Sequence, residues 1–173
     1  GSRSRTLAFK ALATLGETLF GVEGTAIGKA RARTLVAALG ARALDVDSQT
    51  MPLYHAAATI ASNYLVALAS AAKTALARSG VPDKNALAAL EPLMQASLDN
   101  LARLGLPEAL TGPIARGDAS TVRRHLEALR VHAPQLVEMY RALGRVTLRV
   151  AKDKQQASAK ALAEVAESLA EDR

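Results

Sequence analysis

The chain has 173 residues, of which half are apolar and 22% are charged, with a formal net charge of +6 and no cysteine. This length fits one domain, or one domain with a small additional piece, and the lack of cysteine excludes disulfides and thiolate metal sites. The basic residues are spread along the chain, and only 3% of the residues are aromatic, which argues against a nucleic-acid binder, since such proteins gather basic residues on one face. Ala and Leu dominate the apolar residues and favour helices, so a mainly α protein is predicted.

Residues 1–17 are predicted to form a polar leader followed by a short helix over 6–15. The first residues lack the apolar core of a signal peptide, so a cytoplasmic protein is expected.

Residues 18–47 have the pattern of a strand over 18–23, a helix over 25–39 and a second strand over 41–47. A strand, a helix and a strand within about 30 residues make a βαβ unit. The glycines nearby do not have the Gly-x-Gly-x-x-Gly spacing of dinucleotide-binding proteins, and no phosphate-binding loop is present. Two strands alone are marginally stable, so this segment is predicted to be a remnant of a larger Rossmann-like sheet.

The pattern after Asp47 is helical throughout. Four helices are predicted: from Ser48 or Thr50 to about Ser79, from Asp83 or Asn85 to about Leu104, from Asp118 to about Arg130, and from Pro134 past Gly144 to about Ala170. Residues 48–151 are predicted to form a helical domain. Residues 152–173 are polar on most faces and are predicted to be an exposed or frayed helical tail.

The run Ser48–Ala72 contains no charged residue. Such a run is expected to be buried, and its many Ala and polar residues favour burial in protein over a membrane span. It is predicted to lie at the centre of an intertwined helical dimer. On a helix His55 and Ser62 lie within roughly 20° of each other and Asn63 is displaced by roughly 80°. These polar side chains either form hydrogen bonds inside the protein or face a site.

The second candidate is the loop Thr111–Asp118. Its hydroxyl, its glycine backbone and Arg116 suit an anionic or carbonyl-bearing small molecule. The alternative is a plain turn in which Asp118 caps the next helix. The histidines at 125 and 132 have no nearby carboxylates in a ligand pattern, and no metal site is expected.

Three segments together, Leu53–Tyr64, Ala109–Asp118 and Tyr140–Arg145, resemble the C-terminal helical domain of a family of bacterial Rossmann-type oxidoreductases. That family is similar in plan to pyrroline-5-carboxylate reductase and to the 6-phosphogluconate dehydrogenase superfamily. The resemblance covers roughly residues 18–151. It implies a helical bundle of the 6-phosphogluconate dehydrogenase C-terminal type, preceded by the βαβ remnant.

The resemblance also implies a function. The chain would be the dimerisation and substrate-side domain of an NAD- or NADP-dependent reductase of a small keto or imino acid, such as ketopantoate. His55 and Asn63 would be catalytic, and the substrate would contact Ser62, Thr111, Gly112, Pro113 and Arg116. Because the dinucleotide fingerprint is absent, the chain would be inactive alone. The alternative is a non-enzymatic helical module for homodimerisation or another interaction.

Overall fold

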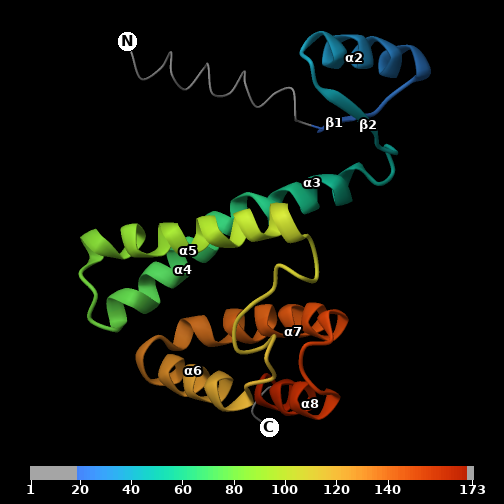
Figure 1. Ribbon diagram of the computed structural model, residues 1–173. Coiled ribbons are helices and arrows are strands. Elements are labelled where there is room, and N and C mark those ends of the chain that lie inside the picture. The colour runs from blue at the N-terminus through green and yellow to red at the C-terminus, as the bar shows by residue number, and fades with distance from the viewer. Residues whose placement is uncertain (1–18, 171–173) are drawn as a thin grey trace. The chain divides into compact units, whose positions relative to one another are not determined.

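The computed structural model describes residues 19–170, which form two compact units divided between Leu65 and Val66 (Figure 1). The fold is mainly helical, with a short two-stranded parallel sheet at the start of the described chain. This confirms the predicted fold class. The predicted leader and short helix at 1–17 lie outside the described residues.

The first unit begins with the predicted βαβ arrangement. Strand β1 (Leu19–Val22) and strand β2 (Arg42–Asp45) pair in parallel, and helix α2 (Ala26–Ala38) connects them. The Thr25 side chain caps α2 by accepting a hydrogen bond from the Gly28 N–H at 3.2 Å. The small core of this unit consists of Val22, Val36 and Ala41.

Helix α2 covers the two strands through a narrow contact, and most of its apolar face is uncovered. Two of its large apolar side chains are exposed: Ile27 is 70% exposed and Leu35 is 68% exposed. Val36 packs on the strands instead. Two short strands offer too little area to cover a helix face about 100° wide.

The run predicted to form one helix is divided into α3 (Met51–Ala61) and α4 (Asn63–Arg78). The Ser62 hydroxyl lies 2.7 Å from the carbonyl oxygen of Ala58, and such a bond to the residue four positions earlier bends helices. Neither helix, all of whose residues are described, has a buried residue. These helices are thus exposed or only partly buried in the single chain, and their burial in a dimer stays a prediction. The segment Met51–Arg78 is long and apolar enough to cross a membrane by length and composition alone.

Helix α5 (Asp83–Leu104) follows a turn at Gly80 and ends at Gly105, close to the predicted limits. Gly105 has a φ of 66°, a left-handed conformation that glycine adopts without strain. Lys73 of α4 and Asp83 of α5 form an ion pair at 2.9 Å, which joins the two helices close to the turn.

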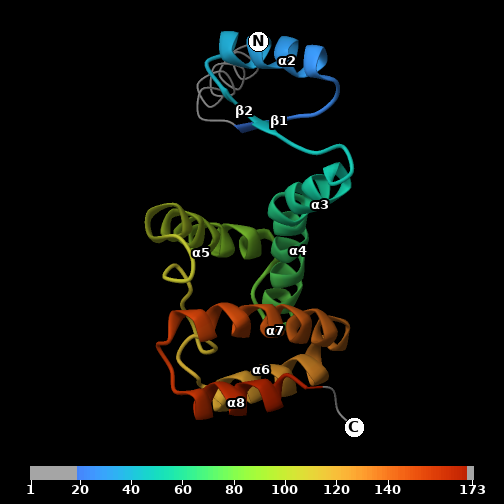
Figure 2. The ribbon, with the colours of Figure 1, turned by 90° about the vertical axis from the view of Figure 1, so that its right-hand side faces the viewer.

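The end of the chain is a three-helix bundle. Helix α6 (Ala119–His132), a short 3-10 turn (Pro134–Leu136), helix α7 (Val137–Lys154) and helix α8 (Ala159–Ser168) follow one another, and the three helices lie side by side in both views (Figures 1 and 2). The core of this bundle consists of Ile114, Ala119, Val122, Leu126, Val137, Leu148, Ala151, Leu162, Val165 and Leu169.

Residues 152–173 are predicted from the sequence to be an exposed or frayed tail, and this prediction is wrong because they include helix α8, which packs in the bundle. Helix α7 ends where Gln155 adopts a left-handed conformation with a φ of 55°, and the Ser158 side chain caps a new helix by accepting from the Ala161 N–H. In this helix Leu162, Val165 and Leu169 are buried in the bundle core. The sequence looks polar because only one narrow stripe of α8 is apolar.

Replacing Leu162 by Ala tests whether α8 belongs to the core. We expect the free energy of unfolding to fall by about 2–5 kcal/mol, since a buried leucine is lost and a cavity remains. Urea denaturation followed by circular dichroism measures this change. The control is Val131→Ala on α6, whose side chain is 68% exposed and should cost less than about 0.5 kcal/mol. Equal, small effects of the two substitutions would show that α8 is not part of the cooperative core.

Candidate functional site

The junction of α3 and α4 carries two of the predicted site residues. The Ser62 hydroxyl oxygen lies 2.7 Å from the Ala58 carbonyl oxygen and 3.0 Å from Oδ1 of Asn63. A hydroxyl has one hydrogen to donate, so these two acceptors compete for it. The structure thus brings Ser62 and Asn63 together and lets them satisfy each other locally.

His55 lies two turns earlier in α3 and is exposed. Its ring centroid is 5.9 Å from that of Tyr54, with the planes tilted by 55°. Tyr54 packs against β1, because a Cβ atom at Gly21 would lie only 2.8 Å from its Cζ atom. His55 forms no hydrogen bond or ion pair with any residue in the described range, so its ring is open to a ligand.

The loop Thr111–Asp118 has a fixed backbone. The Asp118 N–H donates to the Pro113 carbonyl at 2.9 Å, and the Gly117 N–H donates to the Ile114 carbonyl at 3.1 Å. Ile114 is buried in the bundle core. Gly117 has a φ of 71°, and a Cβ atom there would lie 2.6 Å from the Cβ of Ala161 on α8. Only glycine permits this close approach.

The predicted substrate residues occupy this loop in two environments. The side chains of Thr111 and Arg116 are exposed, whereas Gly112 and Pro113 are half-buried. Gly112 has a φ of 93°. The loop therefore presents one hydroxyl and one guanidinium from a rigid backbone, an arrangement common in binding loops.

Lys154, at the end of α7, supports the segment that leads into the loop. Its ammonium group donates to the carbonyl oxygens of Glu108 at 3.0 Å and Leu110 at 2.7 Å. The sequence analysis did not identify this residue. A lysine more than 40 residues away along the chain gives no local signal of such a contact.

Asp118 caps α6, as the alternative interpretation of the loop predicts. Its carboxylate accepts hydrogen bonds from the Thr121 N–H at 3.0 Å and from the Ser120 hydroxyl at 2.8 Å. These bonds, with that of the Thr121 backbone the strongest, lower the pKa of Asp118 to about 2. The cap accounts for Asp118 and leaves a binding role open for the rest of the loop.

The predicted site residues fall into two groups. His55, Ser62 and Asn63 lie in the first unit, and Thr111, Gly112, Pro113 and Arg116 lie in one loop of the second. Ser62 and Asn63 are hydrogen-bonded to each other, whereas the ring that His55 contacts is that of its sequence neighbour Tyr54.

The residues between β1 and α2 do not fit a dinucleotide. Gly24 is the only glycine in this turn, and the exposed carboxylate of Glu23 lies beside the start of α2, where a pyrophosphate would need backbone N–H groups and no negative charge. Within residues 19–170 no group of three or more potential ligands could hold a metal ion.

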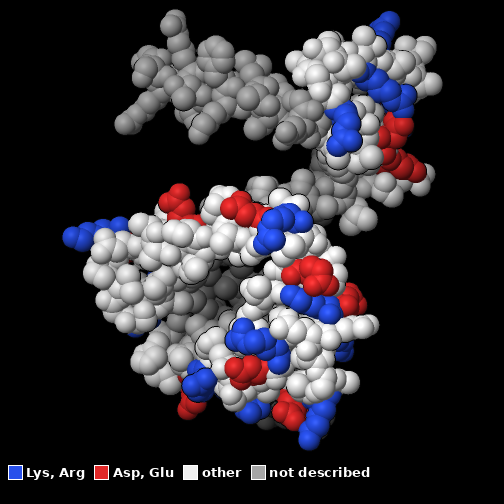
Figure 3. Space-filling model, viewed as in Figure 1, with Lys and Arg blue, Asp and Glu red and all other residues white. Residues whose placement is uncertain are grey.

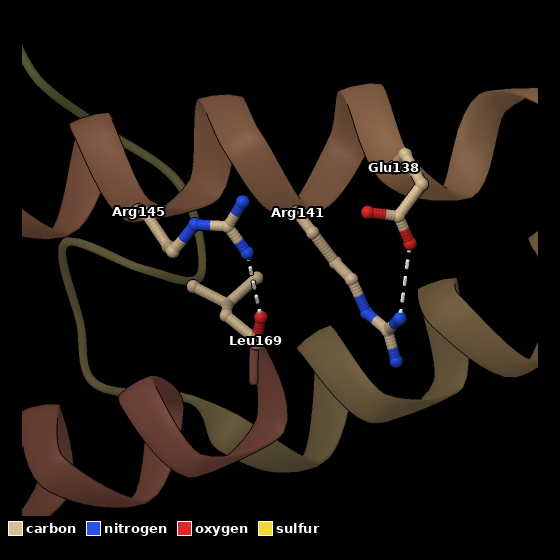
Figure 4. A network of polar contacts seen from close by, with 4 residues as sticks. All are labelled: Glu138, Arg141, Arg145 and Leu169. Atoms are coloured by element: carbon tan, nitrogen blue, oxygen red, sulfur yellow. Dashed lines mark hydrogen bonds and ion pairs between the residues drawn. The ribbon is translucent and has the colours of Figure 1, made fainter. Parts of the chain in front are cut away.

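The segment Tyr140–Arg145 holds the bundle together. A Cβ atom at Gly144 would lie 2.5 Å from Cδ2 of Leu169, so α7 and α8 approach closely there. Arg145 donates to the Leu169 carbonyl at 3.3 Å, and the buried Arg141 bonds to Glu138 at 3.1 Å (Figure 4). This segment, one of the three that carry the resemblance, therefore has a structural role.

Residues 18–147 match the family model described as a domain of unknown function (DUF2520). Among solved structures, the chain is similar to protein TM1727 from Thermotoga maritima, with 26% sequence identity, a TM-score of 0.74 and coverage of 84% of this chain. The chain spans 58% of the length of that protein. No curated protein matches the sequence.

The low pKa of Asp118 predicts a pH dependence of stability. Because the pKa of about 2 in the folded state lies below the ordinary value of 3.8, the carboxylate stabilises the fold above about pH 4, and this contribution is lost as the pH falls toward 2. An Asp118→Asn variant keeps a capping oxygen but does not titrate. The stability advantage of the original protein over this variant should shrink between pH 4 and pH 2 in urea denaturation.

The Asp118→Ala variant is the control, since it removes both the cap and the charge. It should be less stable than Asp118→Asn at every pH in this range. If the original protein and Asp118→Asn lose stability in parallel from pH 4 to pH 2, the carboxylate does not contribute as described.

Proposed function

Because this chain belongs to the DUF2520 family, whose domain is of unknown function, we propose its role from its exposed surfaces and its polar residues. It is the dimerisation and substrate-side part of an NAD- or NADP-dependent reductase of a small keto or imino acid, with ketopantoate as the leading candidate. It lacks the cofactor-binding part and is inactive alone. The observation that carries the proposal is the large apolar surface that the chain leaves uncovered.

The βαβ arrangement supports the proposal that its two strands belong to a larger parallel sheet. Its strands expose Leu19 at 51% and Leu44 at 47%, and α2 exposes much of its apolar face. A larger parallel sheet is normally covered on both faces, and adding strands would cover these side chains.

The helices α3, α4 and α5 support homodimerisation. Their exposed large apolar side chains are Leu53, Ile60, Tyr64, Val66, Leu68, Leu87, Leu93, Leu98, Leu101 and Leu104. Large exposed apolar side chains in such number mark interaction surfaces. A second copy of the chain would cover it, because isologous pairs are the commonest oligomers. We name this set the α3–α5 apolar surface.

The catalytic proposal assigns roles to the polar residues. In the first unit, His55 protonates or Asn63 polarises a reacting carbonyl or imine, with Ser62 as a further contact. In the second unit, Arg116 and Thr111, with the Gly112–Pro113 backbone, bind a carboxylate. The cofactor, held by the part that is absent here, supplies the hydride.

We also propose that the protein is bacterial and cytoplasmic and that it binds neither nucleic acid nor a membrane. Lys and Arg side chains are interspersed with Asp and Glu on the face shown in Figure 3 and do not form one basic patch. A duplex-binding surface would gather them.

The reductase assignment is tested with the complete protein, including its dinucleotide-binding part. NADPH oxidation is measured with ketopantoate and with related keto and imino acids. We expect His55→Ala or Asn63→Ala to lower kcat by about a hundredfold, the usual contribution of a positioned acid. Asn85→Ala at the start of α5, which no role involves, should leave kcat unchanged. Rates like those of the original protein in both His55→Ala and Asn63→Ala would remove their catalytic roles.

The second candidate function is a non-enzymatic homodimerisation module. The mutual hydrogen bonding of Ser62 and Asn63 favours it, because locally satisfied polar groups suit an interface as well as an active site. If Asn63→Ala dissociates the dimer and leaves turnover and ligand binding intact, the structural role holds and the catalytic role of Asn63 does not.

Dimerisation through the α3–α5 apolar surface is tested with Leu93→Glu. Leu93 is 66% exposed on α5, so a charge there should not disturb the fold of the chain but would be buried in a dimer at high cost. Sedimentation velocity should show a monomer for Leu93→Glu and a dimer for the original protein.

The matched control is Val131→Glu, a substitution of an equally exposed residue on α6. It should leave the dimer intact. A dimer for Leu93→Glu would place the contact elsewhere, and flotation of the original protein with lipid vesicles would favour a membrane as the occupant of this surface.

A further inference from the structure

The second unit contains a cavity that the proposed function does not use. Its volume is about 310 Å³, and it lies between the last turns of α4, the second half of α6 and the start of α7. Its walls are small and apolar, and include Ala75, Ala128 and Ala133. The volume is at the lower end of the range of small-molecule pockets, roughly 300–1,000 Å³.

The polar side chains at this cavity include no carboxylate. Arg78, Ser79, His125, His132 and Tyr140 line it, and no acidic residue does so among the described residues. The Nδ1 atom of His125 lies 2.8 Å from the Tyr140 hydroxyl, with the rings edge to face. This contact fixes the phenol in the wall. Burial raises the pKa of Tyr140, which keeps negative charge off this wall.

The charge of Arg78 is available to a ligand. Arg78 also lines a neighbouring pocket together with Lys73 and Asp83, and these two residues are already joined to each other at 2.9 Å. Arg78 forms no ion pair or hydrogen bond with another residue of the described chain. An apolar cavity with one such guanidinium at its edge is complementary to an anion with an apolar body.

We propose that this cavity binds a small monocarboxylate, with its apolar body among the alanines and its carboxylate at Arg78. The planar guanidinium matches the two oxygens of a carboxylate. A phosphate group carries more charge, and transferring it next to a mostly apolar wall costs more free energy. The cavity volume suits a ligand of about ten non-hydrogen atoms. None of these residues belongs to the groups assigned to the reductase.

The test is a titration of the full chain with benzoate, followed by chemical shifts of the backbone amides. We expect a dissociation constant of about 1 mM or below, with the largest shifts at the ends of α4 and α6. Arg78→Gln should raise the dissociation constant about tenfold, since a charge-assisted bond is lost. Benzyl alcohol and inorganic phosphate should each bind about tenfold more weakly than benzoate.

Arg103→Gln is the matched control, because it removes the same charge from α5 away from the cavity, where Arg103 bonds to Asn100. It should leave the dissociation constant within about twofold. Equal weakening by Arg78→Gln and Arg103→Gln would show diffuse attraction and overturn the proposal. Phosphate binding as tight as benzoate binding would overturn the choice of a carboxylate.

Ala128→Leu tests the cavity itself by filling it without removing a charge. It should abolish the benzoate shifts while the circular dichroism spectrum and the thermal transition stay close to those of the original protein. Unchanged benzoate affinity in this variant would overturn the proposal. A change in its sedimentation without loss of fold would also overturn it, by showing that a second copy of the chain occupies the cavity.

Discussion

The close approach of α7 and α8 at Gly144 and Leu169 is the contact on which the bundle depends. A glycine inside a helix costs roughly 0.5–1 kcal/mol relative to alanine, and here the absent Cβ leaves room for a leucine that is completely buried. Arg145 then bonds the Leu169 carbonyl, one of the carbonyls that a helix end leaves without an internal partner. Helix α8, held in this way, packs on the loop at Gly117 through Ala161. The loop backbone therefore follows from the helix packing.

The helices α3 to α5, unlike those of the bundle, bury almost none of their side chains in the single chain. Their composition is as apolar as that of a core, yet α3 and α4, which are described in full, contain no buried residue and α5 has only Ala86. Composition specifies the environment that a segment requires, but it does not specify which chain supplies it. The run without charges predicts burial, its residues are not buried in the single chain, and their burial against a second chain stays a prediction. The same holds for the apolar face of α2, for which two strands give too little cover.

The elements that depend on local signals could be predicted from the sequence. The βαβ order, the limits of α5 and the cap at Asp118 follow from turn residues, capping residues and periodicity, and the structure has them close to the predicted positions. The break at Ser62 and the separate α8 were missed, because a side-chain bond to the helix backbone and a narrow apolar stripe alter the pattern little. Contacts between distant residues, such as Lys154 with Leu110 or His125 with Tyr140, leave no trace in local spacing.

The geometry also divides the candidate site residues by how their polar groups are satisfied. The Ser62 hydroxyl donates to the Ala58 carbonyl or to Oδ1 of Asn63, whereas the side-chain N–H groups of Asn63 form no hydrogen bond among the described residues. Burying Asn63 in an interface therefore requires a partner there, because an unsatisfied buried group costs about 1–3 kcal/mol. Arg116 and Thr111 instead extend from a backbone that Pro113, Gly117 and Asp118 hold in place, and a rigid backbone with exposed polar side chains favours ligand binding. On this argument the loop is the stronger candidate for the substrate contact. His55, exposed and without a hydrogen-bonding partner among the described residues, is the stronger of the two candidates for proton transfer, because an imidazole can act as a general acid or base and a carboxamide cannot.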